Sequence, residues 1–404
     1  MRAVRDPVPD NFDTSSVLSW RKPHLGIDMK SAGRVIETIK AEQEDGYSDD
    51  SLFNIKPWGA DLSFRELIDR YDHDELVKPE LQRNYVWDRR EASRFIDSLL
   101  LGLPVPSIFL AQAKDEKLLI IDGYQRIMTV RDFVRGVFSR DEKAFALSRT
   151  DKINPRWRGK QFNELTDAEQ RRIRNTTIHA IIFAQQKEPQ SDDTSLFQVF
   201  ERINTSGRTL TAQEIRNCVA QGALNKLLFR LNDLQAWRAL FGTSEPDPRM
   251  RDMELILRFF ALSAPSFQHT AKERLSLRQY LDIFMKGHAD INATVGEEMS
   301  ARFTAMVSRA HSMFGPTAFQ NTLHSKSAKA GPKFSPTIFD SIAIAIDRSI
   351  ERKLDEPINA QERKTSLLSD QEYRAVIAQE TMRKSSITKR IEKACHYLFD
   401  TRYE

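Results

Sequence analysis

Two spacings of apolar residues divide the chain. Before the polar loop at 187–194, short apolar runs alternate with helical patterns, whereas after Ser195 apolar positions recur every three or four residues. Short apolar runs bounded by turn residues are typical of strands, and the longer period is typical of amphipathic helices. Strands are predicted at 77–81, 107–112, 118–121 and 179–184. The sequence therefore predicts an α+β fold, a small mixed sheet with helices followed by a largely α-helical region.

Capping patterns mark where three of the predicted helices begin. In a capping box, a small polar side chain accepts a hydrogen bond from the backbone three residues later, where an acidic side chain reaches back. The matching pairs are Ser63 with Glu66, Asp88 with Glu91, and Thr211 with Glu214. Further helices are predicted at 223–241, 250–262, 275–286, 299–314, 337–352 and 386–399.

These patterns predict three parts. Residues 1–56 are polar, with early prolines and an acidic stretch at 42–50, which indicates a loose arm with one short helix around 32–43. Residues 57–190 hold the predicted sheet, and residues 191–404 form the predicted helical domain.

The candidate chemistry centres on the turn after the predicted strand at 118–121. Asp122 and Gly123 are turn residues, and Gly123 is free to take positive φ. Gln125 and Arg126 then fall in the first turn of a helix, where unpaired N–H groups and the positive dipole end favour an anion. A guanidinium there adds a bidentate phosphate donor. The alternative is an ordinary strand-turn-helix with a solvated arginine.

Charge limits how the chain could meet nucleic acid. It has 404 residues, 61 basic and 57 acidic, so the net charge is only +4 and any DNA contact must come from local patches. One basic stretch holds Arg156, Arg158 and Lys160 around Trp157, and another lies at 171–174. Basic residues interleaved with an aromatic one suit phosphate contacts and base stacking. Arg156, Arg158 and Lys160 are therefore predicted to bind DNA, with solvated surface as the alternative.

Several chemistries are not favoured. The two cysteines fit no disulfide framework or zinc spacing, which favours a reducing cytoplasm. The acidic run at 72–75 includes a histidine, but consecutive residues cannot all face one metal, so no metal site is predicted there. No phosphate-binding or zinc-protease motif of the usual patterns occurs. No apolar run is long enough for a membrane span, and the N-terminus lacks the apolar stretch of a secretion signal.

Five short motifs occur in a fixed order. They are Gln82-Arg83 before Tyr85 and Trp87, the stretch at 98–106, the Asp122 turn, residues 200–207 with 212–217, and residues 252–258. Over roughly residues 60 to 260, the chain thus resembles the N-terminal domain family of the GmrSD-type restriction endonucleases. The resemblance implies a ParB/sulfiredoxin-like fold in which an Asp-Gly-x-Gln-Arg turn binds nucleotide phosphates. The family usually has Gln where this chain has Tyr124, which leaves the base of the NTP open.

The resemblance also implies roles for individual residues. Arg126 and Arg83 would hold phosphates, and Gln125 would position phosphate or water. Asp122 would orient the turn, or bind Mg²⁺ or a water. The nucleotide-binding set is completed by Gln82, Gly123, Tyr124, Arg202, Asn204, Thr205 and Gly207. A helix stop made of turn residues is the alternative for 204–207.

The expected function is a nucleotide-binding, NTP-hydrolysing module of a bacterial anti-phage or restriction system that acts on or senses DNA and switches a partner effector. The alternatives are a DNA endonuclease or nickase that uses the same cleft, and a non-enzymatic DNA-binding adaptor. Many family members carry a His-Asn-His nuclease domain, but no His-led motif of that kind follows residue 260. Cleavage by this chain alone is therefore the less favoured expectation.

Overall fold

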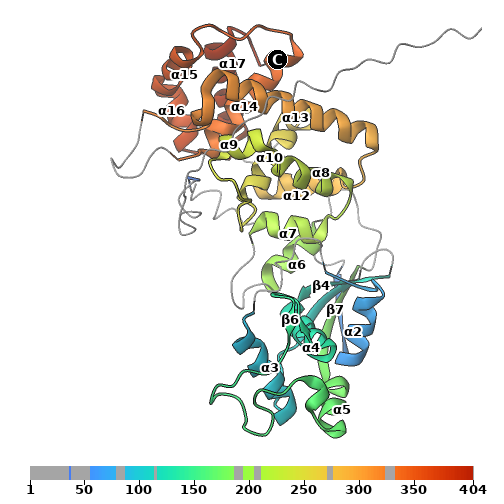
Figure 1. Ribbon diagram of the computed structural model, residues 1–404. Helices are drawn as coiled ribbons and strands as arrows, with labels where there is room; N and C mark the ends of the chain where they lie inside the picture. Colours follow the sequence, from blue (N-terminus) through green and yellow to red (C-terminus); the bar gives the residue numbers. More distant parts are fainter. Residues whose placement is uncertain are drawn as a thin grey trace, which may run out of the picture.

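A sheet-bearing part and a helical part lie at opposite ends of an elongated molecule (Figure 1). The computed structural model describes residues 36–37, 55–78, 87–112, 116–185, 194–203, 211–270, 276–323 and 333–403. The α+β architecture followed by helices is confirmed. In the part of the chain that is described, no helix is both long and apolar enough to cross a membrane.

The sheet is mixed and has the strand order β1-β7-β3-β4-β2. Its strands are β1 (Ile55–Ser63), β2 (Leu76–Val77), β3 (Ile108–Gln112), β4 (Leu118–Asp122) and β7 (Thr177–Gln185). The pairs β1/β7 and β3/β4 are antiparallel, whereas β3/β7 and β2/β4 are parallel. Two short strands, β5 (Val137–Phe138) and β6 (Lys143–Ala144), form a separate ribbon.

Strand β1 was not predicted from the sequence, and the predicted arm overlaps its first two residues. Pro57 and Gly59 interrupt any apolar alternation, and most of the strand is exposed. Because β1 is at the edge of the sheet and pairs only with β7, it tolerates a proline that an inner strand would not.

Four helices cover one face of the sheet. They are α2 (Phe64–Asp72), α3 (Arg89–Leu101), α4 (Tyr124–Arg135) and α5 (Asp167–Asn175), with a short 3-10 turn at Phe162–Glu164. Between them and the sheet lies the first core, here called the sheet core, which includes Leu110, Ile120, Ile127 and Phe133. The capping box at Asp88 is confirmed, whereas Ser63 caps α2 and the Glu66 carboxylate binds Arg70 instead.

The rest of the chain is helical and builds a second core, the helical core, which includes Phe259, Phe303 and Ile342. The helices are α6 (Ser195–Ile203), α7 (Ala212–Val219), α8 (Ala223–Asn232), α9 (Gln235–Phe241), α10 (Arg251–Ser263), α11 (Pro265–Gln268), α12 (Leu277–Gly287), α13 (Ala293–Phe314), α14 (Pro336–Glu351), α15 (Ala360–Ser369), α16 (Gln371–Ala378) and α17 (Lys384–Phe399). The predicted helix at 223–241 is two helices, and α15 and α16 were not predicted.

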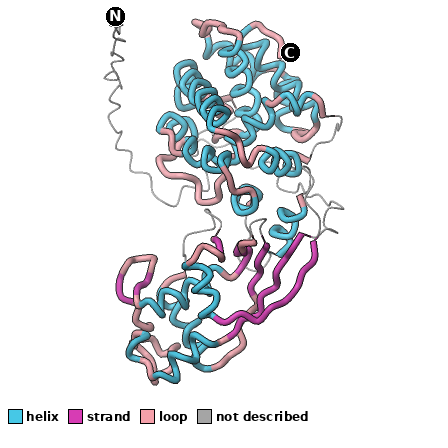
Figure 2. The backbone as a smooth tube through the Cα atoms, turned by 90° about the vertical axis from the view of Figure 1, so that its right-hand side faces the viewer, coloured by secondary structure: helices cyan, strands magenta, loops and turns pink. Residues whose placement is uncertain are grey.

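The second face of the sheet meets this helical core. Ala111 of β3 and Ile121 of β4 belong to it, and the stacked rings of Phe109 and Phe183 pack against it. Figure 2 shows the sheet running beneath the helical part. Of the predicted arm helix, only Ile36 and Glu37 lie within the described residues. Ile36 is buried in the helical core and forms a β-bridge with Phe334, which is not helical geometry.

A buried charge cluster ties the helical part together. The Asp340 carboxylate of α14 accepts from Arg258 of α10 at 3.0 and 2.6 Å and from Arg390 of α17 at 2.7 Å. All three side chains are at most 2 % exposed. Two arginines that lie this deep depend on the shared carboxylate, because an uncompensated buried charge is strongly destabilising.

Asp340→Asn should therefore lower the free energy of unfolding by about 3–5 kcal/mol, because the amide removes the negative charge that the two buried guanidinium groups share. Denaturant unfolding measures the change. The exposed Asp355→Asn is the control and should change stability by less than about 0.5 kcal/mol. Equal stability of the two variants would contradict a structural role for the cluster.

Candidate functional site

A β-bulge determines where Asp122 points. Along β4, Leu118 and Ile120 face the sheet core, and regular alternation would send Asp122 the same way. The β3/β4 register shifts between Phe109 and Leu110, so that Asp122 pairs with Phe109 while Ile120 pairs with Leu110. Directly opposed residues share a face, and Phe109 faces the helical core. The bulge therefore turns Asp122 out of the sheet core, and its side chain is 35 % exposed.

Gly123 makes the sharp turn into α4 possible. Its φ is 106°, and a Cβ atom there would lie 2.2 Å from Cγ2 of Ile108. Both the backbone conformation and the lack of space exclude a side chain. The predicted positive φ is confirmed. The close approach of β3 is a second reason why this position requires glycine.

Arg126 of α4 binds two other segments of the chain. Its Nη1 donates to the carbonyl oxygens of Pro106 at 2.5 Å and Ser107 at 2.8 Å, and its Nη2 pairs with the Asp122 carboxylate at 2.5 Å. The side chain is only 14 % exposed. The alternative interpretation of a solvated arginine is thus wrong, because the guanidinium links the segment before β3 to the end of β4.

Gln125 and Tyr124 contact different parts of the chain. The Gln125 side-chain oxygen accepts from the backbone N–H of Trp87 at 3.3 Å. The Tyr124 ring is 8 % exposed, lies 6.5 Å from the Tyr71 ring, and carries the Lys78 ammonium 4.8 Å from its centroid. Burial, with the neighbouring Tyr71, raises the pKa of Tyr124, so the phenol stays neutral.

The structure brings some predicted residues together and leaves others undescribed. Asp122, Gly123, Tyr124, Gln125 and Arg126 form one turn. Gln82, Arg83, Asn204, Thr205 and Gly207 lie outside the described residues. Arg202 is exposed in the last turn of α6.

Lys78 was not predicted from the sequence. It directly follows β2, and no motif marks it. Trp87 and Lys78 both contact the turn, and they are the described residues on either side of the stretch 79–86, which contains Gln82 and Arg83.

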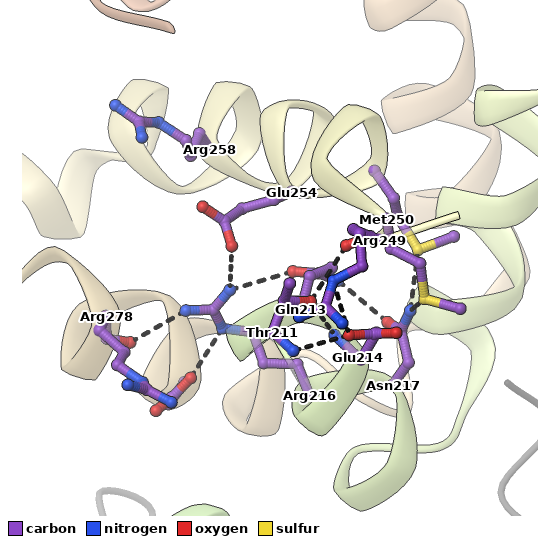
Figure 3. A network of polar contacts seen from close by, with 12 residues as sticks. Thr211, Gln213, Glu214, Arg216, Asn217, Arg249, Met250, Glu254, Arg258 and Arg278 are labelled. Atoms are coloured by element: carbon purple, nitrogen blue, oxygen red, sulfur yellow. Dashed lines mark hydrogen bonds and ion pairs between the residues drawn. The ribbon is translucent and has the colours of Figure 1, made fainter. Parts of the chain in front are cut away.

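A polar network fixes α7 to the helical part (Figure 3). Arg216 is 1 % exposed, and its guanidinium contacts Asp282 of α12 at 2.7 Å and Glu254 of α10 at 3.0 Å. Asp282 and Glu254 both help to hold the pKa of Arg216 high against the opposing effect of burial. The Thr211 capping box starts the same helix, as predicted. Arg216 and Asp282 are buried and paired, so they act in positioning α7.

The predicted DNA-binding residues occupy a surface loop. Arg156 is 67 % exposed and pairs with Glu169 at 2.7 Å, and Arg158 pairs with Asp151 at 3.0 Å. Lys160 is partly exposed. The expectation that an aromatic side chain here could stack on a base is wrong for Trp157, which is 4 % exposed.

The Trp157 ring is held by a buried partner. Its Nε1 donates to the Asp97 carboxylate of α3 at 2.6 Å, and the same oxygen accepts from the Asn154 backbone at 3.0 Å. Trp157 therefore anchors the loop to the sheet core and presents no ring face to solvent.

Comparison of the chain with protein-family models identifies one family. Residues 64–220 match the model of the GmrSD restriction endonuclease, N-terminal domain. This part of the chain belongs to that family. No curated protein and no solved structure matches the chain. The matched GmrSD segment runs from α2 to just beyond α7, so it contains the whole turn and α6 and α7 as well as most of the sheet. The domain is thus of a kind found in restriction systems.

Gly123→Ala should destabilise the domain by about 2–4 kcal/mol, because it adds positive-φ strain and a clash with Ile108. Gly136→Ala is the matched control at the other end of α4. Its φ is 77°, but a Cβ there would meet nothing within 4 Å, so only the strain of about 1–2 kcal/mol applies. Denaturant unfolding measures the free energy of unfolding of both variants. Equal losses of stability would show that the close contact with Ile108 does not contribute to the effect at Gly123.

Proposed function

We propose that the GmrSD N-terminal domain of this chain binds a nucleoside triphosphate at the turn 122–126 and hydrolyses it, as a switch in a bacterial anti-phage restriction system. The observation that carries the proposal is the partly exposed Asp122–Arg126 pair, which a bulge and a side-chain-free glycine hold at the start of a helix. Phosphoryl transfer requires positioning and charge more than covalent help from the protein.

The Arg126 contacts suggest how phosphate would be received. The two carbonyl bonds to Nη1 hold the guanidinium in place, while Nη2 faces the partly exposed Asp122. A phosphate oxygen would compete with Asp122 for Nη2 and form a charge-assisted hydrogen bond. The carboxylate released in this way would then orient a water, and Gln125 would position the same water or the phosphate.

Mg²⁺ fits this site only together with the nucleotide. Among the described residues, no group of three His, Cys, Asp or Glu side chains is placed to hold a metal. Mg²⁺ often binds through one or two carboxylates, with phosphate oxygens and waters as its other ligands. Asp122 would be that carboxylate, and the ion would neutralise phosphate charge. Gln82, Arg83, Arg202, Asn204, Thr205 and Gly207 remain proposed nucleotide contacts.

Arg126→Ala should weaken nucleotide binding about ten- to hundredfold, because it removes a charge-assisted bond. Calorimetric titration with each NTP measures this, and Arg135→Ala at the far end of α4 is the matched control. Asp122→Asn should keep binding but lose phosphate release, which a phosphate assay follows. A folded Arg126→Ala protein that binds every NTP like wild type would refute the phosphate site.

We also propose that DNA is the second ligand, and that it meets the segment 137–176. That segment has ten Lys or Arg against six Asp or Glu, a net +4 equal to that of the whole chain. Arg156 and Arg158 each form an ion pair with a carboxylate. Within the described structure, Arg171 and Arg174 of α5 have no carboxylate within 4 Å. The α5 arginines are therefore the better phosphate donors.

Replacing Arg171 and Arg174 together by Ala should flatten the slope of log affinity against log salt by about 0.9 for each phosphate that the variant no longer neutralises. The double Ala variant of Arg156 and Arg158 should change the slope less, because both cations are already paired. Fluorescence titration of duplex DNA at several salt concentrations measures the slopes. An unchanged slope for the α5 variant would remove α5 from the interface.

The nucleotide state would be passed to a partner effector or nuclease. Robust Mg²⁺-dependent cleavage of DNA by the purified chain, abolished by Arg126→Ala, would instead favour a nuclease that uses the same cleft.

A further inference from the structure

Lys78 is a half-buried cation beside the turn. Its ammonium lies 4.8 Å from the centroid of the buried Tyr124 ring, the first residue of α4. It also lies near the Cys218 thiol of α7, which is fully buried and whose pKa burial raises to about 12. Lys78 therefore sits where the sheet-bearing part meets α7, with neutral groups around it.

No described group neutralises this charge. Within the ranges that the structure describes, no carboxylate lies within 4 Å of the Lys78 ammonium. The neighbouring arginines do have carboxylate partners: Arg126 pairs with Asp122, and Arg131 pairs with Asp72 at 2.8 Å. Burial lowers the pKa of Lys78, which is the expected response of an ammonium that loses water without gaining an anion.

The Tyr124 ring compensates this loss only in part. A cation over an aromatic face gains about 0.5–2 kcal/mol, but the ring is neutral and leaves the full charge in place. Partly burying an ammonium without a counter-charge is unfavourable, and perturbed groups of this kind gather at functional sites. An anionic ligand at the turn would provide the missing charge.

The sheet order places Lys78 and Arg126 on two sides of the turn. Lys78 follows β2, and Arg126 binds the segment that leads into β3, while β4 lies between these strands. Adjacent strands are about 4.8 Å apart, so the flanking segments are about 10 Å apart. A chain of two or three phosphoryl groups extends between such positions better than a single phosphate.

We propose that Lys78 is a phosphate-contacting residue of this site, and that Lys78 and Arg126 together select a nucleoside di- or triphosphate over a monophosphate. This inference rests on the proposed nucleotide-binding function. Tyr124 then serves as the platform that holds the ammonium in position.

The test compares the full chain with Lys78→Met, which keeps the length and apolar stem but removes the charge. Lys56→Met on the exposed edge strand β1 is the matched control. Nucleoside mono-, di- and triphosphates and inorganic pyrophosphate are titrated calorimetrically. We expect at least a tenfold loss of affinity for tri- and diphosphate and for pyrophosphate, and a smaller loss for monophosphate. Lys78→Arg should recover part of the affinity.

Thermal melting without ligand separates this role from a structural one. Lys78→Met should melt at the wild-type temperature or higher, because it removes a half-buried charge that no carboxylate of the described residues neutralises. Wild-type affinity in Lys78→Met, while Arg126→Ala still binds weakly, would overturn this inference and leave the proposed function standing. An equal loss for all ligands with a lowered melting temperature would also overturn it. If wild type binds neither triphosphate nor pyrophosphate, both proposals fall.

Discussion

The candidate site depends on one backbone position that has no room for a side chain. At Gly123 the chain leaves β4 with φ of 106° and passes so close to Ile108 that a Cβ atom would lie 2.2 Å from its Cγ2. This approach joins β3, β4 and the start of α4 into one rigid corner. At this corner Arg126 binds the Pro106 and Ser107 carbonyls that precede β3 and the Asp122 carboxylate at the end of β4.

The corner also lies between two cores. Ile120 packs in the sheet core, Ile121 packs in the helical core, and Asp122 follows them directly. Ile120 and Ile121 face opposite cores by the ordinary alternation of a strand, and the bulge places Asp122 on the side of Phe109, away from the sheet core. A change in the charge at Asp122 is thus adjacent to side chains of both parts of the molecule. Bulges are found next to active sites for this reason, since they redirect a side chain without breaking the sheet.

The sequence was sufficient for local features and insufficient for those that depend on distant neighbours. The turn at Gly123 and the capping box at Asp88 are encoded within a few residues and were predicted. Strand β1 was missed because its pairing with β7, more than a hundred residues away, overrides the proline and the glycine within it. Arg126 was predicted as a site residue, but its hydrogen bonds to backbone carbonyls were not. The accepting carbonyls belong to the segment before β3, about twenty residues earlier in the chain. Lys78 carries no motif, and only its place over the Tyr124 ring distinguishes it from a surface lysine.

Helix α7 is held by a buried ion-pair network that links it to two other helices. Its Cys218 thiol lies near Lys78, and its Arg216 is bound to Glu254 of α10 and Asp282 of α12. Arg216 is buried and paired with carboxylates on two other helices, so α7 cannot shift without straining that network. The family match ends at residue 220, just after α7, so the Arg216 network begins inside the matched segment and reaches α10 and α12 beyond it.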